Sequence, residues 1–125
     1  MLIEMFQAKI HRATITGADV DYEGSIEISG DLLDVTGIRE YQKICVWNID
    51  NGSRLETYVL RAANNSGKIN INGAGAKLNF VGNKVILATY CSMFPDEANQ
   101  HKPTVVLVDA QNKITSIVNQ SGGMK

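Results

Sequence analysis

The strongest hairpin signal in the chain is KICVWNIDNGSRLETYVLR, residues 43–61. Its two outer runs, 43–49 and 54–61, are short, largely apolar and rich in β-branched and aromatic residues, as strands are. The four residues between them, Asp50-Asn51-Gly52-Ser53, have the composition of a tight turn. This stretch therefore predicts two antiparallel strands, and it sets a mainly β fold class.

The same pattern of short runs bounded by turns continues through the chain. Further extended segments are predicted at 3–16, 20–22, 26–28, 68–71, 84–93, 104–109 and 114–118. Turns or loops are predicted at 16–19, 64–67 and 110–113. Short helical segments are predicted at 29–37, with Gly37 as the stop, after the turn at 72–76, and at 95–98.

Many short strands and few helices predict a small β-barrel or sandwich. Residues 1–118 are expected to form one domain, and the polar, Gly-rich residues 119–125 a flexible tail. Most strand-like segments are apolar on both faces. This fits a barrel that packs into an oligomer.

Composition excludes several classes of function. The 125 residues carry a net charge of −1 without a basic block, which argues against nucleic acid as a partner. No apolar run approaches the ~18 residues of a membrane span, and residues 1–12 do not resemble a signal peptide, so we expect no membrane association and a cytoplasmic location. Cys45 and Cys91 lack metal-site spacing, so we predict buried free thiols and no metal.

Chemistry is suggested by Tyr22-Glu23-Gly24-Ser25. An ordinary turn has the same composition. A serine hydroxyl can also attack the preceding carbonyl and convert the amide into an ester. Glycine at that position leaves the carbonyl open and permits strained backbone angles, while nearby donors would stabilise the oxyanion. Elimination would then release residues 1–24 and leave dehydroalanine, and loss of ammonia on hydrolysis would leave a pyruvoyl group at residue 25.

A pyruvoyl group would serve as a covalent cofactor. Its ketone forms a Schiff base with a substrate amine, and the adjacent carbonyl accepts the electrons released when carbon dioxide leaves. Pyridoxal phosphate does the same work as a separate molecule. A chain that makes this group from Ser25 needs no bound cofactor.

Several stretches together resemble the aspartate 1-decarboxylase family, the pyruvoyl enzymes that make β-alanine for pantothenate and coenzyme A. The order and spacing match from about Leu2 to Met93. The matching stretches are Lys9-Ile10-His11-Arg12, Tyr22-Glu23-Gly24-Ser25, Trp47-Asn48, Asn51-Gly52-Ser53-Arg54, Thr57-Tyr58 and Asn72-Gly73-Ala74. The resemblance implies decarboxylation of L-aspartate at C1, a double-psi β-barrel, and a homotetramer with active sites between subunits. It leaves open whether a maturation factor triggers cleavage.

The resemblance also implies roles for single residues. Ser25 is similar to the pyruvoyl precursor and Gly24 to the residue before the cut. Thr57 resembles the residue that assists self-cleavage at the substrate site, and Tyr58 resembles the proton donor. Tyr22 and Tyr41 are also available for that role, and only the resemblance selects Tyr58. The remaining matches are Asn72 and a substrate-binding turn of backbone at Gly73, Ala74 and Gly75, where Gly75 replaces the expected alanine.

A dicarboxylic substrate requires cations. Arg54 can bind a carboxylate with two parallel hydrogen bonds. Lys9 and His11 are two residues apart and share a strand face at a spacing of roughly 7 Å. We predict Arg54 for the side-chain carboxylate and Lys9 as a second cation, against the alternative of a solvated lysine. His11 is either a site residue or a structural histidine, and Trp47 suits the core better than the site.

Strand parity separates these candidates. Arg54 and Tyr58 share a face but lie about 13 Å apart along a regular strand, and Thr57 points the opposite way. One substrate cannot easily reach all three within one regular strand. A long Arg side chain, strong twist or a site shared between subunits would resolve this, and we take it as support for the shared site. The alternative function is a non-catalytic β-barrel that serves in binding or assembly.

Overall fold

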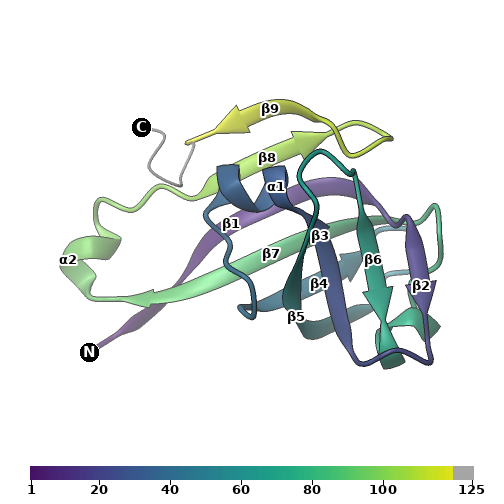
Figure 1. Cartoon of the computed structure of the whole chain (residues 1–125). Helices are drawn as coiled ribbons and strands as arrows, with labels where there is room; N and C mark the ends of the chain where they lie inside the picture. Colours follow the sequence, from purple (N-terminus) through teal and green to yellow (C-terminus); the bar gives the residue numbers. More distant parts are fainter. Residues whose placement is uncertain (120–125) are drawn as a thin grey trace.

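The computed structural model describes residues 1–119 (Figure 1). Its elements are β1 (Ile3–Thr14), β2 (Gly17–Asp19), β3 (Ser25–Ser29), α1 (Gly30–Thr36), β4 (Lys43–Asn48), β5 (Arg54–Ala62), β6 (Ile69–Asn72), the 3-10 helix η1 (Gly73–Lys77), β7 (Lys84–Met93), α2 (Pro95–Ala98), β8 (Thr104–Val108) and β9 (Ile114–Val118). The predicted mainly β fold class is confirmed.

The strands form one mixed sheet in the order β2-β6-β3-β5-β4-β7-β1-β8-β9. Three pairs are parallel, namely β1 with β8, β2 with β6 and β3 with β5. The sheet curls into a barrel because β1 leads directly into β2 at its far edge (Figure 1). In the connecting segment, Ile15 N–H donates to the Asn83 carbonyl and Thr16 N–H to the Ile69 carbonyl.

Side chains that alternate along the strands fill the barrel. On β4, Ile44 and Val46 are buried, while Cys45 and Trp47 between them are half-buried on the outer face. Cys91 is also half-buried. Both thiols are free as predicted, but the prediction that they are buried is wrong. The alternation of a strand turns them away from the core. Partial burial raises the pKa of both thiols.

The region before β3 differs from the prediction. Residues 16–19 were expected to turn, but Gly17–Asp19 forms β2, in parallel register with Asn70–Asn72. Residues 20–22 were expected to be extended, but they form the turn. Asp19 accounts for this shift, because its side chain accepts a hydrogen bond from Asp21 N–H at 3.0 Å and its carbonyl one from Tyr22 N–H at 3.4 Å.

Most other predicted elements are confirmed within a residue or two. The 43–61 hairpin pairs as expected, and β7 and α2 have the predicted bounds. Helix α1 ends at Gly37, which has a φ of 77°. Of the predicted tail, Asn119 donates a hydrogen bond to the Pro103 carbonyl, and residues 120–125 lie outside the described residues. No helix within 1–119 is long and apolar enough to cross a membrane.

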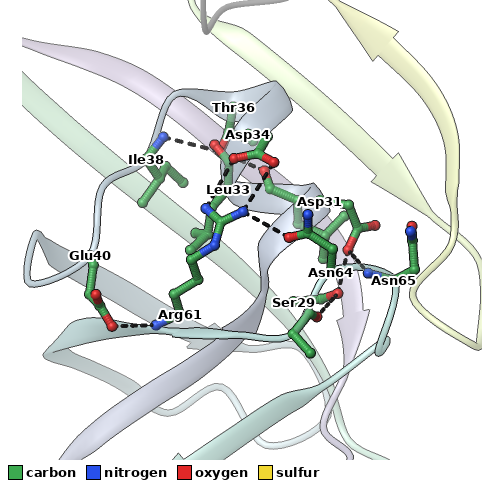
Figure 2. Close-up of polar contacts among 12 residues, drawn as sticks. Ser29, Asp31, Leu33, Asp34, Thr36, Ile38, Glu40, Arg61, Asn64 and Asn65 are labelled. Carbon is green, nitrogen blue, oxygen red and sulfur yellow. Dashed lines mark hydrogen bonds and ion pairs between the residues drawn. The ribbon is translucent and has the colours of Figure 1, made fainter.

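A polar network joins α1 to the end of β5 (Figure 2). The Arg61 guanidinium donates to both Asp34 carboxylate oxygens, at 3.0 and 3.1 Å, and to Asn64 Oδ1 at 2.8 Å. Asp31 accepts hydrogen bonds from the Ser29 hydroxyl and from Asn65 N–H. Because Ser29 is the last residue of β3, this network includes one end of that strand. The other end carries Ser25.

Candidate active site

Ser25 begins β3 and is only 1% exposed. Across the antiparallel β3–β6 pair it lies opposite Asn72. The Asn72 Nδ2 donates to Ser25 Oγ at 3.2 Å, and Ser25 Oγ donates to the Glu23 carbonyl at 3.4 Å. The structure describes the intact chain, with Gly24 joined to Ser25. In it, the hydroxyl is held at a fixed position by two hydrogen bonds.

Two pockets adjoin the Gly24–Ser25 peptide. Gly24 lines the first, of about 290 Å³, together with Thr57 and Asn72. Its other walls are Leu55, Glu56, Ile71, Ala74, Gly75 and Leu78. Ser25 lines the second, of about 460 Å³, together with Tyr22 and Tyr58. The remaining walls of that pocket are Asp21, Glu23 and Leu60.

Strand β5 supplies one candidate residue to each pocket. It runs parallel to β3, with Val59 opposite Ile26. Successive side chains of a strand point to opposite faces. Thr57 therefore lines the pocket that Gly24 lines, and Tyr58 the pocket that Ser25 lines. Burial alternates along this part of β5, with Leu55 and Thr57 half-buried and Glu56 and Tyr58 exposed, as the predicted parity requires. Glu56 nevertheless reaches the first pocket as well.

The turn after β6 lies beside the same peptide. Gly73 begins η1 with a φ of 75°, and Ala74 and Gly75 line the first pocket. A methyl group at Gly75 would lie 3.0 Å from Ile71 and 3.2 Å from Leu55. The alanine expected there would thus crowd the apolar wall, so glycine leaves this pocket wider.

Gly24 itself is not strained. Its φ lies outside the left-handed region, and a methyl group built on it would meet no atom within 4 Å. The intact chain therefore shows no left-handed strain at this position. The residue is exposed, which agrees with the expectation of an open position before the serine.

A second group of candidates lies apart from these pockets, on the outer face of β1, β4 and β5. Arg54 pairs with Trp47 across β4 and β5, and its guanidinium carbon lies 4.5 Å from the centre of the indole ring. Trp47 is half-buried there, so its assignment to the core is wrong. Lys9 and His11 flank buried Ile10 on β1. None of these four residues lines either of the two pockets.

His11 differs in charge from its neighbours. Within the described residues its Nδ1 is buried without a hydrogen-bond partner. Burial lowers the pKa of the imidazole, and the positive charges of Lys9 and Arg12 lower it further. His11 is therefore predominantly neutral at neutral pH, so the cations of this group come from lysine and arginine.

The sequence did not predict the apolar walls of the first pocket, or the role of the Glu23 carbonyl as a hydrogen-bond acceptor. A signal existed for Leu55, because it stands two residues before Thr57 and so shares its strand face. Nothing in the sequence marks the Glu23 carbonyl as an acceptor. No cluster of three or more His, Cys, Asp or Glu side chains suited to a metal ion occurs in residues 1–119.

Comparison with known proteins places this site in a family. The sequence profile described as aspartate decarboxylase matches residues 1–115. The chain belongs to the aspartate decarboxylase family. It is 50% identical over 113 residues to the aspartate 1-decarboxylase of Chloroherpeton thalassium, covering 90% of this chain and 83% of that one. It is also 50% identical over 119 residues to that of Ruminiclostridium cellulolyticum, covering 95% and 93%.

A third relative, the aspartate 1-decarboxylase of Desulfotalea psychrophila, is 47% identical over 118 residues, covering 94% of this chain and 99% of that one. The three matches extend over nearly the whole chain, which agrees with the family assignment. The resemblance predicted from the motifs is confirmed, and with it the double-psi β-barrel of the aspartate decarboxylase family, which the nine-stranded mixed sheet fits.

Proposed function

We propose that the chain is a proenzyme that cuts its own Gly24–Ser25 peptide and turns Ser25 into a covalent pyruvoyl cofactor. With that group it decarboxylates L-aspartate at C1 to β-alanine and carbon dioxide, for the synthesis of pantothenate and coenzyme A in the cytoplasm. Membership of the aspartate decarboxylase family supports the decarboxylation. The buried Ser25 hydroxyl, held by Asn72 beside an open glycine, is the observation that carries the self-cleavage.

The cleavage uses groups that the chain supplies. Ser25 Oγ bonds to the Gly24 carbonyl carbon, the C–N bond breaks, and the hydroxyl proton goes to the nitrogen. Asn72 orients the hydroxyl. Thr57 lines the same pocket as Gly24, and its hydroxyl is our candidate donor to the oxyanion. The Ser25 Cα proton then leaves, the Cβ–O bond breaks, and Gly24 departs as a carboxylate. Water finally displaces ammonia.

The surroundings of Ser25 suit a carbonyl group. Asn72 Nδ2 is a donor, and a ketone in place of the serine accepts such a bond. When present, the pyruvoyl group supplies the electron sink for loss of carbon dioxide. Tyr58 lines the pocket that Ser25 lines, so its hydroxyl can deliver the proton to the product carbon, while Tyr22 forms another wall. The backbone of Gly73, Ala74 and Gly75 is proposed to bind substrate.

The substrate carboxylates require the second group of residues. Arg54 and Lys9 are our candidate cations, Trp47 supports the Arg54 guanidinium, and His11 borders Lys9. Arg54 and Tyr58 lie about 13 Å apart along β5, too far for one aspartate. We therefore place the second group of a neighbouring subunit over the Ser25 pockets, in a homotetramer.

Mass spectrometry and an activity assay test this function together. We expect purified protein to yield fragments 1–24 and 25–125, the latter lighter by one ammonia than a hydrolysed product, and to form β-alanine from aspartate. Ser25→Ala should abolish both. Incubating the pure chain alone also shows whether a maturation factor is required. A chain that stays intact after prolonged incubation with and without cell extract, and forms no β-alanine, would instead support the non-catalytic binding module.

A further inference from the structure

Two backbone segments touch beside the Gly24–Ser25 peptide. Gly73 follows Asn72 at the end of β6, and Gly24 precedes Ser25 at the start of β3, across an antiparallel pair in which Ser25 faces Asn72. A Cβ atom built on Gly73 would lie 2.6 Å from the Gly24 Cα, 2.8 Å from the Gly24 nitrogen and 3.2 Å from the Tyr22 carbonyl oxygen. All three atoms belong to the backbone, which cannot move aside as a flexible side chain can.

Comparison with other glycines distinguishes the steric effect of this contact from the effect of a positive φ. Gly52, in the hairpin turn after β4, has the same φ of 75°, but a Cβ on it would meet no atom within 4 Å. A Cβ on Gly24 would also meet nothing within that distance. Beside the Gly24–Ser25 peptide, a side chain would therefore clash at Gly73 and not at Gly24. Gly73 lies against this peptide in space, although it is 49 residues from Gly24 in sequence.

We propose that Gly73 is a positioning residue for self-cleavage. Its missing side chain lets residues 22–24 lie directly against the end of β6, which holds the Gly24 carbonyl within reach of the Ser25 hydroxyl. This inference rests on the proposed self-cleavage and adds a residue to it. Any side chain at position 73 forces the cleaved segment outward by most of an ångström, while Asn72 still holds Ser25 Oγ.

Displacement of this size matters because the first step is an intramolecular attack. Ser25 Oγ must approach the Gly24 carbonyl carbon as the C–O bond forms, the C–N bond breaks and the hydroxyl proton passes to the nitrogen. A misplacement of about 1 Å can slow such a step by roughly 10²-fold. The later elimination begins from an ester already formed. Loss of Gly73 should therefore block the chain at the amide.

The test compares two positions with the same φ. Gly73→Ala and Gly73→Asn are made beside Gly52→Ala and Gly52→Asn, and cleavage of each purified precursor is followed by intact mass. Asparagine tolerates positive φ best among residues with a Cβ, and Asn65 has a φ of 60° in this chain. Each change is also placed in the uncleavable Ser25→Ala chain, where the melting temperature reports folding alone.

We expect the Gly52 variants to cleave at the parent rate and both Gly73 variants to cleave at least about tenfold more slowly. In the Ser25→Ala chain, the Gly73 variants should still fold. They should melt below the Gly52 variants because only the Cβ at position 73 displaces backbone. Hydroxylamine cleaves esters and not ordinary amides, so it should release no fragment 1–24 from the stalled Gly73 variants.

Three results would overturn the positioning role while leaving the proposed function intact. The first is cleavage of Gly73→Asn at the parent rate. The second is loss of folding by both Gly73 variants when the Gly52 variants fold, which makes the contact structural. The third is release of fragment 1–24 by hydroxylamine, which moves the block to the elimination. A parent chain that never cleaves would overturn the proposed function as well.

Discussion

Asn72 is the side chain that acts most directly on Ser25. It is 5% exposed, and its Nδ2 donates to Ser25 Oγ at 3.2 Å. We predict that Asn72→Ala slows self-cleavage by roughly 10²-fold, the usual cost of removing one positioned donor from a reacting centre. Cleavage half-times measured by intact mass check this.

The control for Asn72→Ala is Asn70→Ala, two residues earlier on the same strand. Asn70 Oδ1 accepts a hydrogen bond from the Thr16 hydroxyl at 2.6 Å, so its loss affects stability away from Ser25. We expect Asn70→Ala to cleave at the parent rate. Equal slowing by both changes would mean that Asn72 acts through the stability of β6 and not through the serine.

At this scale the sequence suggested where chemistry could occur, but not the geometry around it. The Gly24-Ser25 step is a candidate for self-cleavage because a nucleophile and its possible target are adjacent in the chain. The contact of Gly73 with Gly24 was not predictable, because it depends on which strands pair and on the close packing of two backbones. Local sequence does not encode such an approach.

Among the elements, β2 shows where local patterns fail. Thr16-Gly17-Ala18-Asp19 has turn composition and no apolar alternation, so a turn was predicted there. The structure pairs Gly17–Asp19 with Asn70–Asn72, more than fifty residues later. Such a strand is imposed by tertiary pairing and not by propensity. The 43–61 hairpin was predictable because its strands and turn are contiguous.

On helix α1, the stability contributed by a buried side chain can be compared with that contributed by a surface ion pair. Leu32 is 0% exposed, and its truncation should lower the free energy of unfolding by about 2–5 kcal/mol. Arg61→Gln removes the ion pair with Asp34, but that pair lies in solvent and should contribute far less. Urea unfolding of Leu32→Ala and Arg61→Gln, both in the Ser25→Ala chain, measures the difference. A larger loss from Arg61→Gln would show that the network in Figure 2 anchors α1.

For the whole molecule, the candidate site residues of one chain fall into two separate groups. One chain carries Ser25, Thr57, Tyr58 and Asn72 around its pockets. It also carries Arg54 stacked on Trp47, on an outer face that includes exposed Tyr90 and Ile49. Parity along β5 predicted this separation from the sequence. Which chain supplies the cations could not be predicted, because the sequence of one strand contains no information on how subunits meet.

Mixed oligomers test the shared site directly. Ser25→Ala lacks the reacting group and Arg54→Ala lacks the cation, so each should be inactive alone. If each site combines Ser25 of one subunit with Arg54 of its neighbour, co-expression restores complete sites in mixed tetramers. With random mixing of equal amounts, roughly a quarter of the sites pair an intact Ser25 with an intact Arg54 from the other variant. β-Alanine formation by the co-purified oligomer measures the recovery.

A mixture of Ser25→Ala with Tyr58→Phe is the matched control, because both changes fall in the same group and cannot complement if that group comes from one subunit. No activity in the Arg54 mixture would place the Ser25 and Arg54 of a working site in the same chain. Activity in the control would show that Ser25 and Tyr58 of one site come from different chains.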